Sequence, residues 1–218
     1  MTKTIEPFLI GMTGLSGAGK TFYVNRLKEQ FGDKICILGF DDYYKPLEEQ
    51  QIDEHGEANY DLPTALYSDR FFNDLLKLIE YQTIVIRKYQ FEHYDAPEVM
   101  ETIEPAPIIL VEGLFVMEFN AVDSMLNYRI FIDCDTELCF NRRLERDIRE
   151  RNIPRERSLH QWNHHVMPAY QKYIEPHKER CNLVVENVGP PEENIQTILN
   201  HIKMNAHPSA LQALDGLI

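Results

Sequence analysis

The sequence has few of the features that mark secreted, membrane or nucleic-acid-binding proteins. Its four cysteines are scattered, without a C-x-x-C pair or a histidine at zinc-finger spacing, so we expect reduced thiols and neither a zinc knuckle nor a disulfide framework. No apolar run approaches the roughly 18 residues of a membrane-spanning helix, and the N-terminal apolar stretch is too short for a secretory signal.

Basic residues are also scarce. The chain has 22 lysines and arginines against 35 acidic residues, which gives a formal net charge of -13. This charge repels nucleic acids and anionic membranes, so we expect neither as a partner. The sequence therefore predicts a cytoplasmic protein that acts on small molecules, and it leaves a homo-oligomer open.

The composition is that of an ordinary folded protein, with 44% hydrophobic and 26% charged residues in 218 positions, which predicts a single domain over residues 1–218. Short apolar runs alternate with segments of helical periodicity, a pattern typical of an α/β fold with a parallel sheet between helices. The expected strands are 8–12, 35–40, 107–113, 128–133 and 182–186. The expected helices are about 20–31, 64–80, 136–150, 156–175 and 191–205.

Three segments fall outside this alternation. Residues 41–63 have neither a helix nor a strand pattern, and their length indicates a functional loop. Residues 83–105 alternate polar and apolar positions, which predicts a small antiparallel excursion from the main sheet. Residues 206–218 fit either a short docking helix or a frayed end.

The segment GLSGAGKT matches the phosphate-binding pattern G-x-x-x-x-G-K-[ST], between an expected strand and an expected helix. Glycines let backbone N–H groups turn toward phosphate oxygens, and the helix N-terminus adds partial positive charge. The lysine would reach the β- and γ-phosphates, and the threonine hydroxyl would bind Mg²⁺. The candidate nucleotide-binding residues are Gly14, Leu15, Ser16, Gly17, Ala18, Gly19, Lys20, Thr21 and Phe22.

Carboxylates follow two other expected strands. Asp41 and Asp42 come after the second run, and Glu112 comes after the third. Because ligands of open parallel sheets bind beyond the carboxyl ends of the strands, we expect these acids to share one crevice with the glycine-rich loop. Asp41 could act as the general base for an attacking hydroxyl, and Glu112, with Asp41, could hold Mg²⁺. Asp42 is expected to be structural.

Arginines cluster in the expected helix at 136–150. Five of them lie within about three turns of an otherwise acidic chain: Arg142, Arg143, Arg146, Arg149 and Arg151. Interleaved acids would also permit a solvent-exposed, salt-bridged helix. Beside a phosphate-binding loop, a lid over about 139–160 that brings guanidinium groups to a transferring phosphoryl group is the better interpretation.

The ordered segments GLSGAGKT, DDYYK, NYDLPTAL, YQFEH, IILVEGLF, RRLERDIRER, LHQW and PAYQKYIEP resemble the uridine kinase branch of the P-loop kinases over roughly residues 8–190. The resemblance implies a P-loop fold, ATP or GTP as phosphoryl donor with Mg²⁺, and phosphorylation of a pyrimidine nucleoside at its 5′-hydroxyl. It further implies a catalytic role for Asp41 and a substrate-binding role for five residues: Asp61 on the ribose, Tyr89 and His93 on the base, and Arg143 and Gln161 on the nucleoside. The resemblance also implies that Arg146 and Arg151 are lid residues near the phosphates, which makes them the catalytic candidates among the arginines.

The chain departs from that family pattern on the acceptor side. Leu62 stands where uridine kinases usually have histidine, the aromatic segment continues as Tyr94-Asp95, and Asn152 follows Arg151 where a lid glycine is common. A kinase of the same superfamily that acts on a pantothenate-like or sugar-like acceptor is therefore a second hypothesis. A P-loop switch without an organic acceptor is a third, although no N-K-x-D guanine-reading string is present.

Histidines in the segment HQWNHH also have a spacing able to bind a metal, since His160 and His164 lie four residues apart on an expected helix. The local sequence offers no third ligand at a fixed spacing, and histidines on a solvated helix face are common. The sequence therefore does not predict a metal site there.

Overall fold

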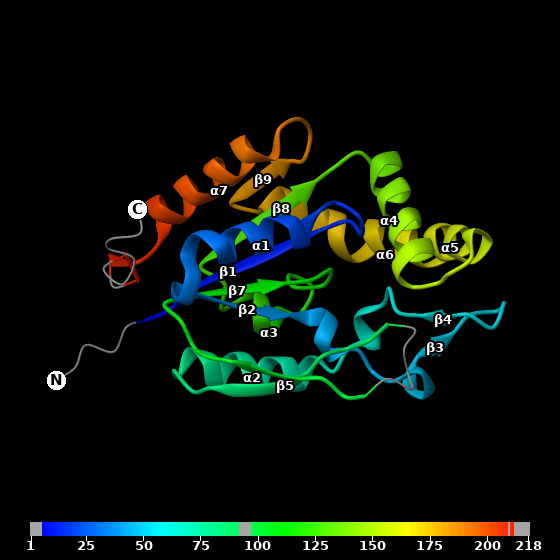
Figure 1. The fold of residues 1–218 in the computed structure, drawn as a ribbon, viewed down its shortest axis with the longest axis horizontal. Helices are drawn as coiled ribbons and strands as arrows, with labels where there is room; N and C mark the ends of the chain where they lie inside the picture. Colours follow the sequence, from blue (N-terminus) through cyan, green and yellow to red (C-terminus); the bar gives the residue numbers. More distant parts are fainter. Residues whose placement is uncertain (1–5, 92–96, 209, 212–218) are drawn as a thin grey trace.

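A five-stranded parallel sheet forms the centre of the computed structural model, which describes residues 6–91, 97–208 and 210–211 (Figure 1). Its strand order is β2-β7-β1-β8-β9, and each neighbouring pair runs parallel. The strands are β1 (Phe8–Gly14), β2 (Ile35–Gly39), β7 (Ile108–Glu112), β8 (Tyr128–Asp133) and β9 (Leu183–Glu186). The expected α/β class and all five expected strands are confirmed.

The strands are continuous apolar runs because helices cover both faces of the sheet. In β1 and β7, consecutive side chains such as Ile109 and Leu110 are fully buried, although they point to opposite faces. The register aligns Glu112 at the end of β7 with Met12 of β1 and Gly39 of β2. Three strands therefore end at the same rim.

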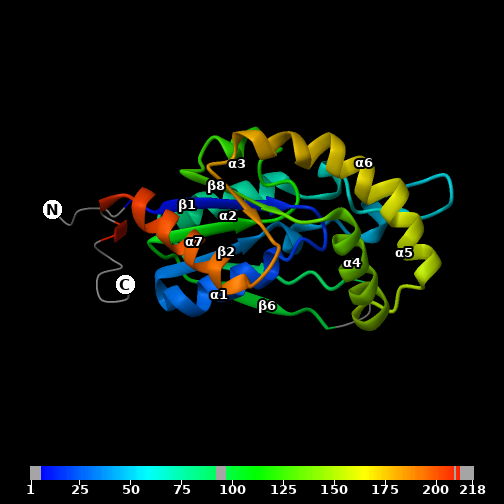
Figure 2. The same cartoon turned by 90° about the horizontal axis from the view of Figure 1, so that it is seen from above.

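The helices lie on the two faces of this sheet, with α1 and α7 on one side and α3 and α6 on the other (Figure 2). At the rim where β1 and β7 end, α4 and α5 stand across the carboxyl ends of the strands (Figure 1). The helices are α1 (Lys20–Phe31), α2 (Ser68–Ile79), α3 (Asn120–Asp123), α4 (Thr136–Glu150), α5 (Arg155–Gln161), α6 (Met167–Ala169) and α7 (Pro191–Asn205).

Local chemistry explains where α4 starts. The carboxylate of Asp135 accepts a hydrogen bond from the backbone N–H of Leu138 at 3.0 Å and so caps the helix.

None of the helices within the described residues is both long and apolar enough to cross a lipid bilayer.

The structure confirms the prediction for residues 83–105 and differs from the prediction for residues 41–63. The antiparallel excursion is confirmed, since β5 (Ile84–Arg87) pairs with β6 (Met100–Ile103). Residues 41–63 were expected to have no regular structure, but they contain the two-residue strands β3 (Gln51–Ile52) and β4 (Ala58–Asn59) and several 3₁₀ turns. Strands of two residues are too short to leave a periodic signal in the sequence.

The helix expected at 156–175 is interrupted twice. After α5, the chain widens into π-helical turns at Trp162–Val166 and Tyr170–Ile174, on either side of α6, and then tightens into a 3₁₀ turn at Glu175–Arg180. Of the tail at 206–218, Ala206 and Ala210 are buried, whereas residues 209 and 212–218 lie outside the described part.

A stacked aromatic pair supports the turn after β2. Phe40 and Phe71 lie with ring centroids 3.6 Å apart and planes 11° from parallel, and both rings are fully buried. Phe40 also fills the space beside Gly113, where an added Cβ would come within 2.7 Å of the Phe40 Cβ. This packing anchors the backbone next to Asp41.

We expect Phe71→Ala to lower the free energy of unfolding by about 3–5 kcal/mol, because it removes a buried ring and leaves a cavity under Phe40. Phe22→Ala is the matched control: this phenylalanine is 38% exposed on α1. Its loss should cost less than about 1 kcal/mol. Urea unfolding measures both, and equal losses would contradict the packing argument.

Candidate active site

The glycine-rich loop joins β1 to α1 and requires glycine at several positions, two of which lie beside α4 and the chain after β9. Gly17 and Gly19 have φ values of +84° and +95°, in the left-handed region. A Cβ at Gly17 would collide with the carbonyl oxygen of Cys139, and one at Gly19 would lie 2.7 Å from the amide nitrogen of Asn187. The loop is therefore packed against α4 and against the chain that follows β9.

Asn187 was not among the predicted site residues. Its side chain donates to the carbonyl of Ala18 at 2.7 Å and accepts from the hydroxyl of Tyr23 at 2.8 Å, so it fixes the loop to α1. Its position directly after the last strand of the sheet is the signal that could have pointed to it.

Lys20 lies folded over the loop. Its Nζ donates to the carbonyl oxygens of Gly14 at 2.9 Å and Leu15 at 3.2 Å. Burial lowers the pKa of Lys20, against the opposing effect of the carboxylates of Glu112 and Asp41. The two acids expected to share a crevice with the loop are thus close enough to act on its lysine.

Glu112 and Asp41 come from adjacent strands, since β2 pairs with β7 and Gly39 lies opposite Glu112. Asp41 is exposed in the 3₁₀ turn Phe40–Tyr43, whereas Glu112 is half-buried at the end of its strand. Burial, reinforced by the charge of Asp41, raises the pKa of Glu112 to about 7. A bound cation would favour the charged form of a carboxyl group whose pKa is raised in this way.

Asp42 has a different environment. Its Oδ2 accepts from Lys88 Nζ at 2.6 Å and its Oδ1 accepts from the backbone N–H of Tyr89 at 3.1 Å. Burial raises the pKa of Asp42, and the hydrogen bond and charge of Lys88 oppose that rise. Asp42 ties the turn after β2 to the segment after β5, which is consistent with the structural role expected for it.

The arginines of α4 converge on one buried acid. Asp147 is completely buried and forms ion pairs with Arg143 at 3.3 Å and Arg151 at 3.4 Å, and Arg146 Nε lies 3.9 Å from it. Ser158 of α5 donates to the same carboxylate at 2.9 Å. Asp147 therefore holds three guanidinium groups together and links α4 to α5.

These guanidinium groups face the loop. Arg143 donates to the hydroxyl of Ser16 at 3.0 Å and lies 3.7 Å from the carboxylate of the buried Asp61. Burial and the charges of Arg151 and Arg143 lower the pKa of Arg146 to about 10. Within the described residues, one contact of this helix fits the alternative of a solvent-exposed, salt-bridged helix. It is the exposed ion pair between Arg149 and Glu145.

A cavity of about 290 Å³ opens between the loop, the strand ends and α4. The predicted site residues that line it are Ser16, Gly17, Gly19, Lys20, Thr21, Asp41, Asp61, Glu112, Arg143, Arg146 and Arg151. Arginine and lysine side chains, loop glycines and carboxylates thus meet in one space. The lining suits a polyphosphate together with a second, polar reactant.

Some predicted residues do not line this cavity. Gly14, Leu15 and Ala18 contribute backbone carbonyls that hold Lys20 and Asn187. Phe22 is exposed, Gln161 is buried in α5, and the ring of Tyr89 lies 4.7 Å from the ring of Phe91. His93 lies outside the described residues. The predicted residues that do not line the cavity are Gly14, Leu15, Ala18, Phe22, Tyr89 and Gln161.

Aromatic residues also line the cavity. Tyr44, Tyr60 and Phe91 line the cavity, and the guanidinium of Arg151 lies 4.4 Å from the centre of the Phe91 ring. The prediction named Tyr89 rather than Phe91, although both belong to the segment YQFEH. Positions two residues apart face the same side of an extended segment. The sequence therefore indicated that an aromatic ring of this segment reaches the cavity, but not which of the two rings does so.

The donor set also fits a hard divalent cation. The hydroxyl of Thr21 and the carboxylates of Asp41 and Glu112 line the same cavity, and oxygen ligands of this kind are those that Mg²⁺ prefers. Burial and the charge of Asp41 raise the pKa of Glu112, and a cation bound by both carboxylates would offset both effects.

Comparison with known proteins agrees with this geometry. The family model described as "Phosphoribulokinase / Uridine kinase family" matches residues 9–194. The chain belongs to this family. A uridine kinase of Leuconostoc citreum is 34% identical over 203 residues, covering 91% of this chain and 96% of the relative. A uridine kinase of Lactiplantibacillus plantarum is 31% identical, covering 91% of this chain and 95% of the relative.

Solved structures share the fold at low sequence identity. One described as a possible uridine kinase from Bacillus stearothermophilus has a TM-score of 0.59 at 17% identity, covering 84% of this chain and 90% of that one. D-glycerate 3-kinase from Cryptococcus neoformans has a TM-score of 0.55 at 13% identity, covering 76% and 78%. As a member of the phosphoribulokinase/uridine kinase family, the protein is an ATP-dependent kinase that transfers phosphate to a hydroxyl group of a small molecule.

We expect Glu112→Gln to stabilise the metal-free, nucleotide-free protein at about pH 8 by about 2 kcal/mol, because the charged carboxylate is the form that burial penalises. The ordinary pKa is 4.5 and the folded value is about 7. The unmodified protein should therefore lose stability relative to the variant as pH rises through that interval, and the two should be equally stable below it.

Urea unfolding in the presence of a chelator measures the difference at several pH values. Glu48→Gln, which changes an exposed glutamate, is the control and should give a small difference without this pH dependence. A gap between Glu112→Gln and the unmodified protein that stays constant with pH, or has the opposite sign, would contradict the buried-carboxyl argument.

Proposed function

We propose that this protein phosphorylates the 5′-hydroxyl of a pyrimidine nucleoside, uridine or cytidine, at the expense of ATP. The observation that carries the proposal is that a phosphate-binding loop with its lysine, acidic side chains and aromatic side chains all line one cavity. The identity of about a third with two uridine kinases over almost their whole length supports the same acceptor.

The donor would lie against the glycine-rich loop. Backbone N–H groups of the loop would bind its phosphate oxygens, and Lys20 would leave the carbonyls of Gly14 and Leu15 to bind the β- and γ-phosphates. Thr21, Asp41 and Glu112 would hold Mg²⁺, which when bound neutralises charge on the phosphate oxygens. GTP would satisfy the same phosphate contacts, so the loop by itself does not select the base of the donor.

Proton transfer would fall to Asp41. As the 5′-oxygen bonds to the γ-phosphorus, the bond from that phosphorus to the bridging oxygen breaks, ADP leaves with the electron pair, and the hydroxyl proton passes to Asp41. Asp41 is exposed in its turn, so it can return the proton to water. Arg146 and Arg151 would stabilise the charge on the transferring group.

The acceptor would occupy the aromatic and acidic side of the cavity. Asp61 would accept hydrogen bonds from the ribose hydroxyls, and Arg143, already beside it at 3.7 Å, would hold the nucleoside. Tyr44, Tyr60 and Phe91 offer rings for packing against a base. Gln161, Tyr89 and His93 are proposed nucleoside contacts on the resemblance alone.

A different small hydroxyl compound is the second candidate acceptor. The half-buried Leu62 follows Asp61, at the position where uridine kinases usually carry histidine, so the residue next to the proposed ribose contact is apolar where that branch has a polar one. D-glycerate 3-kinase has the same fold, which shows that the fold does not restrict the acceptor to nucleosides.

Asp41→Asn should lower kcat about 100-fold or more and leave the affinity for ATP within a few-fold, because the amide cannot accept the hydroxyl proton. Asp69→Asn makes the same chemical change at an exposed site on α2 and should leave kcat unchanged. A steady-state coupled assay measures kcat, and ATP binding is measured separately. Unchanged turnover in Asp41→Asn would remove it from the mechanism.

ATP consumption screened against nucleosides, pantothenate and simple sugars, with the product identified by mass spectrometry, tests the acceptor. We expect uridine or cytidine 5′-phosphate. Transfer only to another alcohol would replace the nucleoside with that acceptor, and consumption with water alone would favour a nucleotide hydrolase.

If uridine is phosphorylated, Asp61→Asn should raise its KM about 10-fold or more while the KM for ATP changes little, since hydrogen bonds to a charged group contribute about 1.5–3 kcal/mol. The unmodified enzyme should prefer uridine to 2′-deoxyuridine, and the variant should discriminate less. An equal preference in both proteins would show that Asp61 does not bind the ribose hydroxyls.

A further inference from the structure

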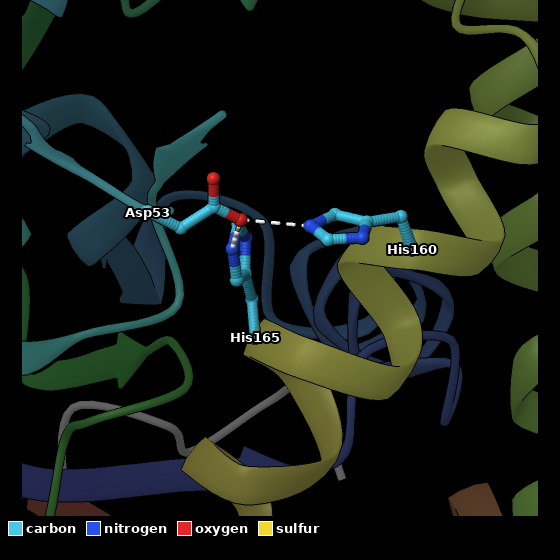
Figure 3. A group of neighbouring side chains, drawn as sticks. All are labelled: Asp53, His160 and His165. Carbon is cyan, nitrogen blue, oxygen red and sulfur yellow. Dashed lines mark hydrogen bonds and ion pairs between the residues drawn. The ribbon is translucent and has the colours of Figure 1, made fainter. Parts of the chain in front are cut away.

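A second cluster of ionisable side chains lies outside the cavity, where the β3–β4 hairpin meets α5. The Oδ2 atom of Asp53 accepts from Nε2 of His160 at 2.7 Å and from Nε2 of His165 at 2.9 Å (Figure 3). One carboxylate oxygen therefore receives two imidazole nitrogens. None of these three residues lines the candidate active site.

The π-helical turn after α5 brings the two histidines to the same side. In a π-helix the hydrogen bond joins residue i to residue i+5, so His165 lies one such turn beyond His160. The sequence analysis paired His160 with His164, as an α-helix would require. In the structure, His164 is exposed, whereas His165 is 3% exposed and points at Asp53.

The carboxylate of Asp53 is held in place by its own hairpin. Its Oδ1 atom accepts from the backbone N–H groups of His55 at 2.9 Å and Glu57 at 2.8 Å, which directs Oδ2 toward the helix. Supporting hydrogen bonds of this kind orient ligands in metal sites. The hairpin is also tied to α5 by the ion pair between Glu57 and Arg157 at 2.6 Å.

We propose that Asp53, His160 and His165 form a binding site for a divalent transition-metal ion of the Zn²⁺ class. Their three candidate donor atoms lie within 4.8 Å of one another. Zinc sites place nitrogen and oxygen ligands about 2.0–2.2 Å from the ion, so small side-chain rotations suffice to enclose one. Two imidazoles with one carboxylate favour zinc over magnesium, which prefers oxygen ligands.

Binding replaces the two hydrogen bonds to Asp53 with metal–ligand bonds. Each imidazole binds the ion in its neutral form: Nε2 gives up the proton that it donated to Asp53, which passes to water, and Nδ1 carries the one proton of the bound ring. Water or His55, whose ring lies 4.8 Å from that of His160, completes the coordination. The ion then joins the β3–β4 hairpin to the helix that begins at Arg155. These two segments are far apart in sequence, since Asp53 and His160 are separated by 107 residues.

Titration of the purified full chain with Zn²⁺, without nucleotide and with Mg²⁺ in excess, tests this site by calorimetry. We expect about one tightly bound Zn²⁺ per chain and a rise in Tm of about 5 °C at saturating zinc. Asp53→Asn and the double variant His160→Gln/His165→Gln should weaken zinc binding about 100-fold or more and abolish the rise in Tm.

Two matched controls separate this site from its surroundings. His164→Gln changes the exposed neighbouring histidine and should keep the zinc affinity, and Glu112→Gln should keep it as well, because the active-site carboxylates do not contribute. X-ray absorption of the zinc-loaded unmodified chain should show at least two imidazole ligands, a result that does not depend on whether any variant folds.

The proposal is overturned if Asp53→Asn and the double variant bind zinc as tightly as the unmodified chain. It is also overturned if zinc is displaced by excess Mg²⁺ or lost in Glu112→Gln, which would place the ion in the active site, or if the absorption spectrum shows oxygen ligands only. The test does not involve phosphoryl transfer, so its outcome is independent of the proposed kinase substrate.

Discussion

The site depends on one constraint, which is that parallel strands bring their carboxyl ends to the same rim of the sheet. The register of β7 places Glu112 between Met12 of β1 and Gly39 of β2. Whatever follows these three strands must therefore lie together: the glycine-rich loop, the turn that carries Asp41, and Glu112 itself. The fully buried strands make this arrangement rigid, because a slip of one residue would turn their side chains to the opposite face.

Asp147 holds the arginine side chains of the lid in place in a similar way. Taking an acid out of water is costly, and the three arginines around it, with the hydroxyl of Ser158, offset that cost. In return, the acid keeps like-charged guanidinium groups close together beside the loop. Those groups remain able to bind an anion, because Asp147 and Asp61 together cannot neutralise three positive charges.

Much of this could be predicted from the sequence, and the exceptions have physical causes. Continuous apolar runs predicted all five strands of the sheet, and the positions of the loop and the acids after these strands predicted that Lys20, Asp41 and Glu112 would meet. The prediction missed Phe91 and Asn187, whose positions depend on how separate segments pack. It also did not find Asp53 beside His160 and His165, because Asp53 is distant in sequence and the π-helical turn changes which histidine faces it.

The sequence by itself determined the class of fold, the phosphate-binding loop and the acids that follow the strands, because these depend on interactions between neighbouring residues and on the covering of both sheet faces. Only the tertiary structure decided which side chains line the cavity, which arginines surround Asp147 and which histidines reach the hairpin. Such contacts depend on how distant segments pack. The periodicity of apolar residues along the chain does not determine how one segment is rotated relative to another.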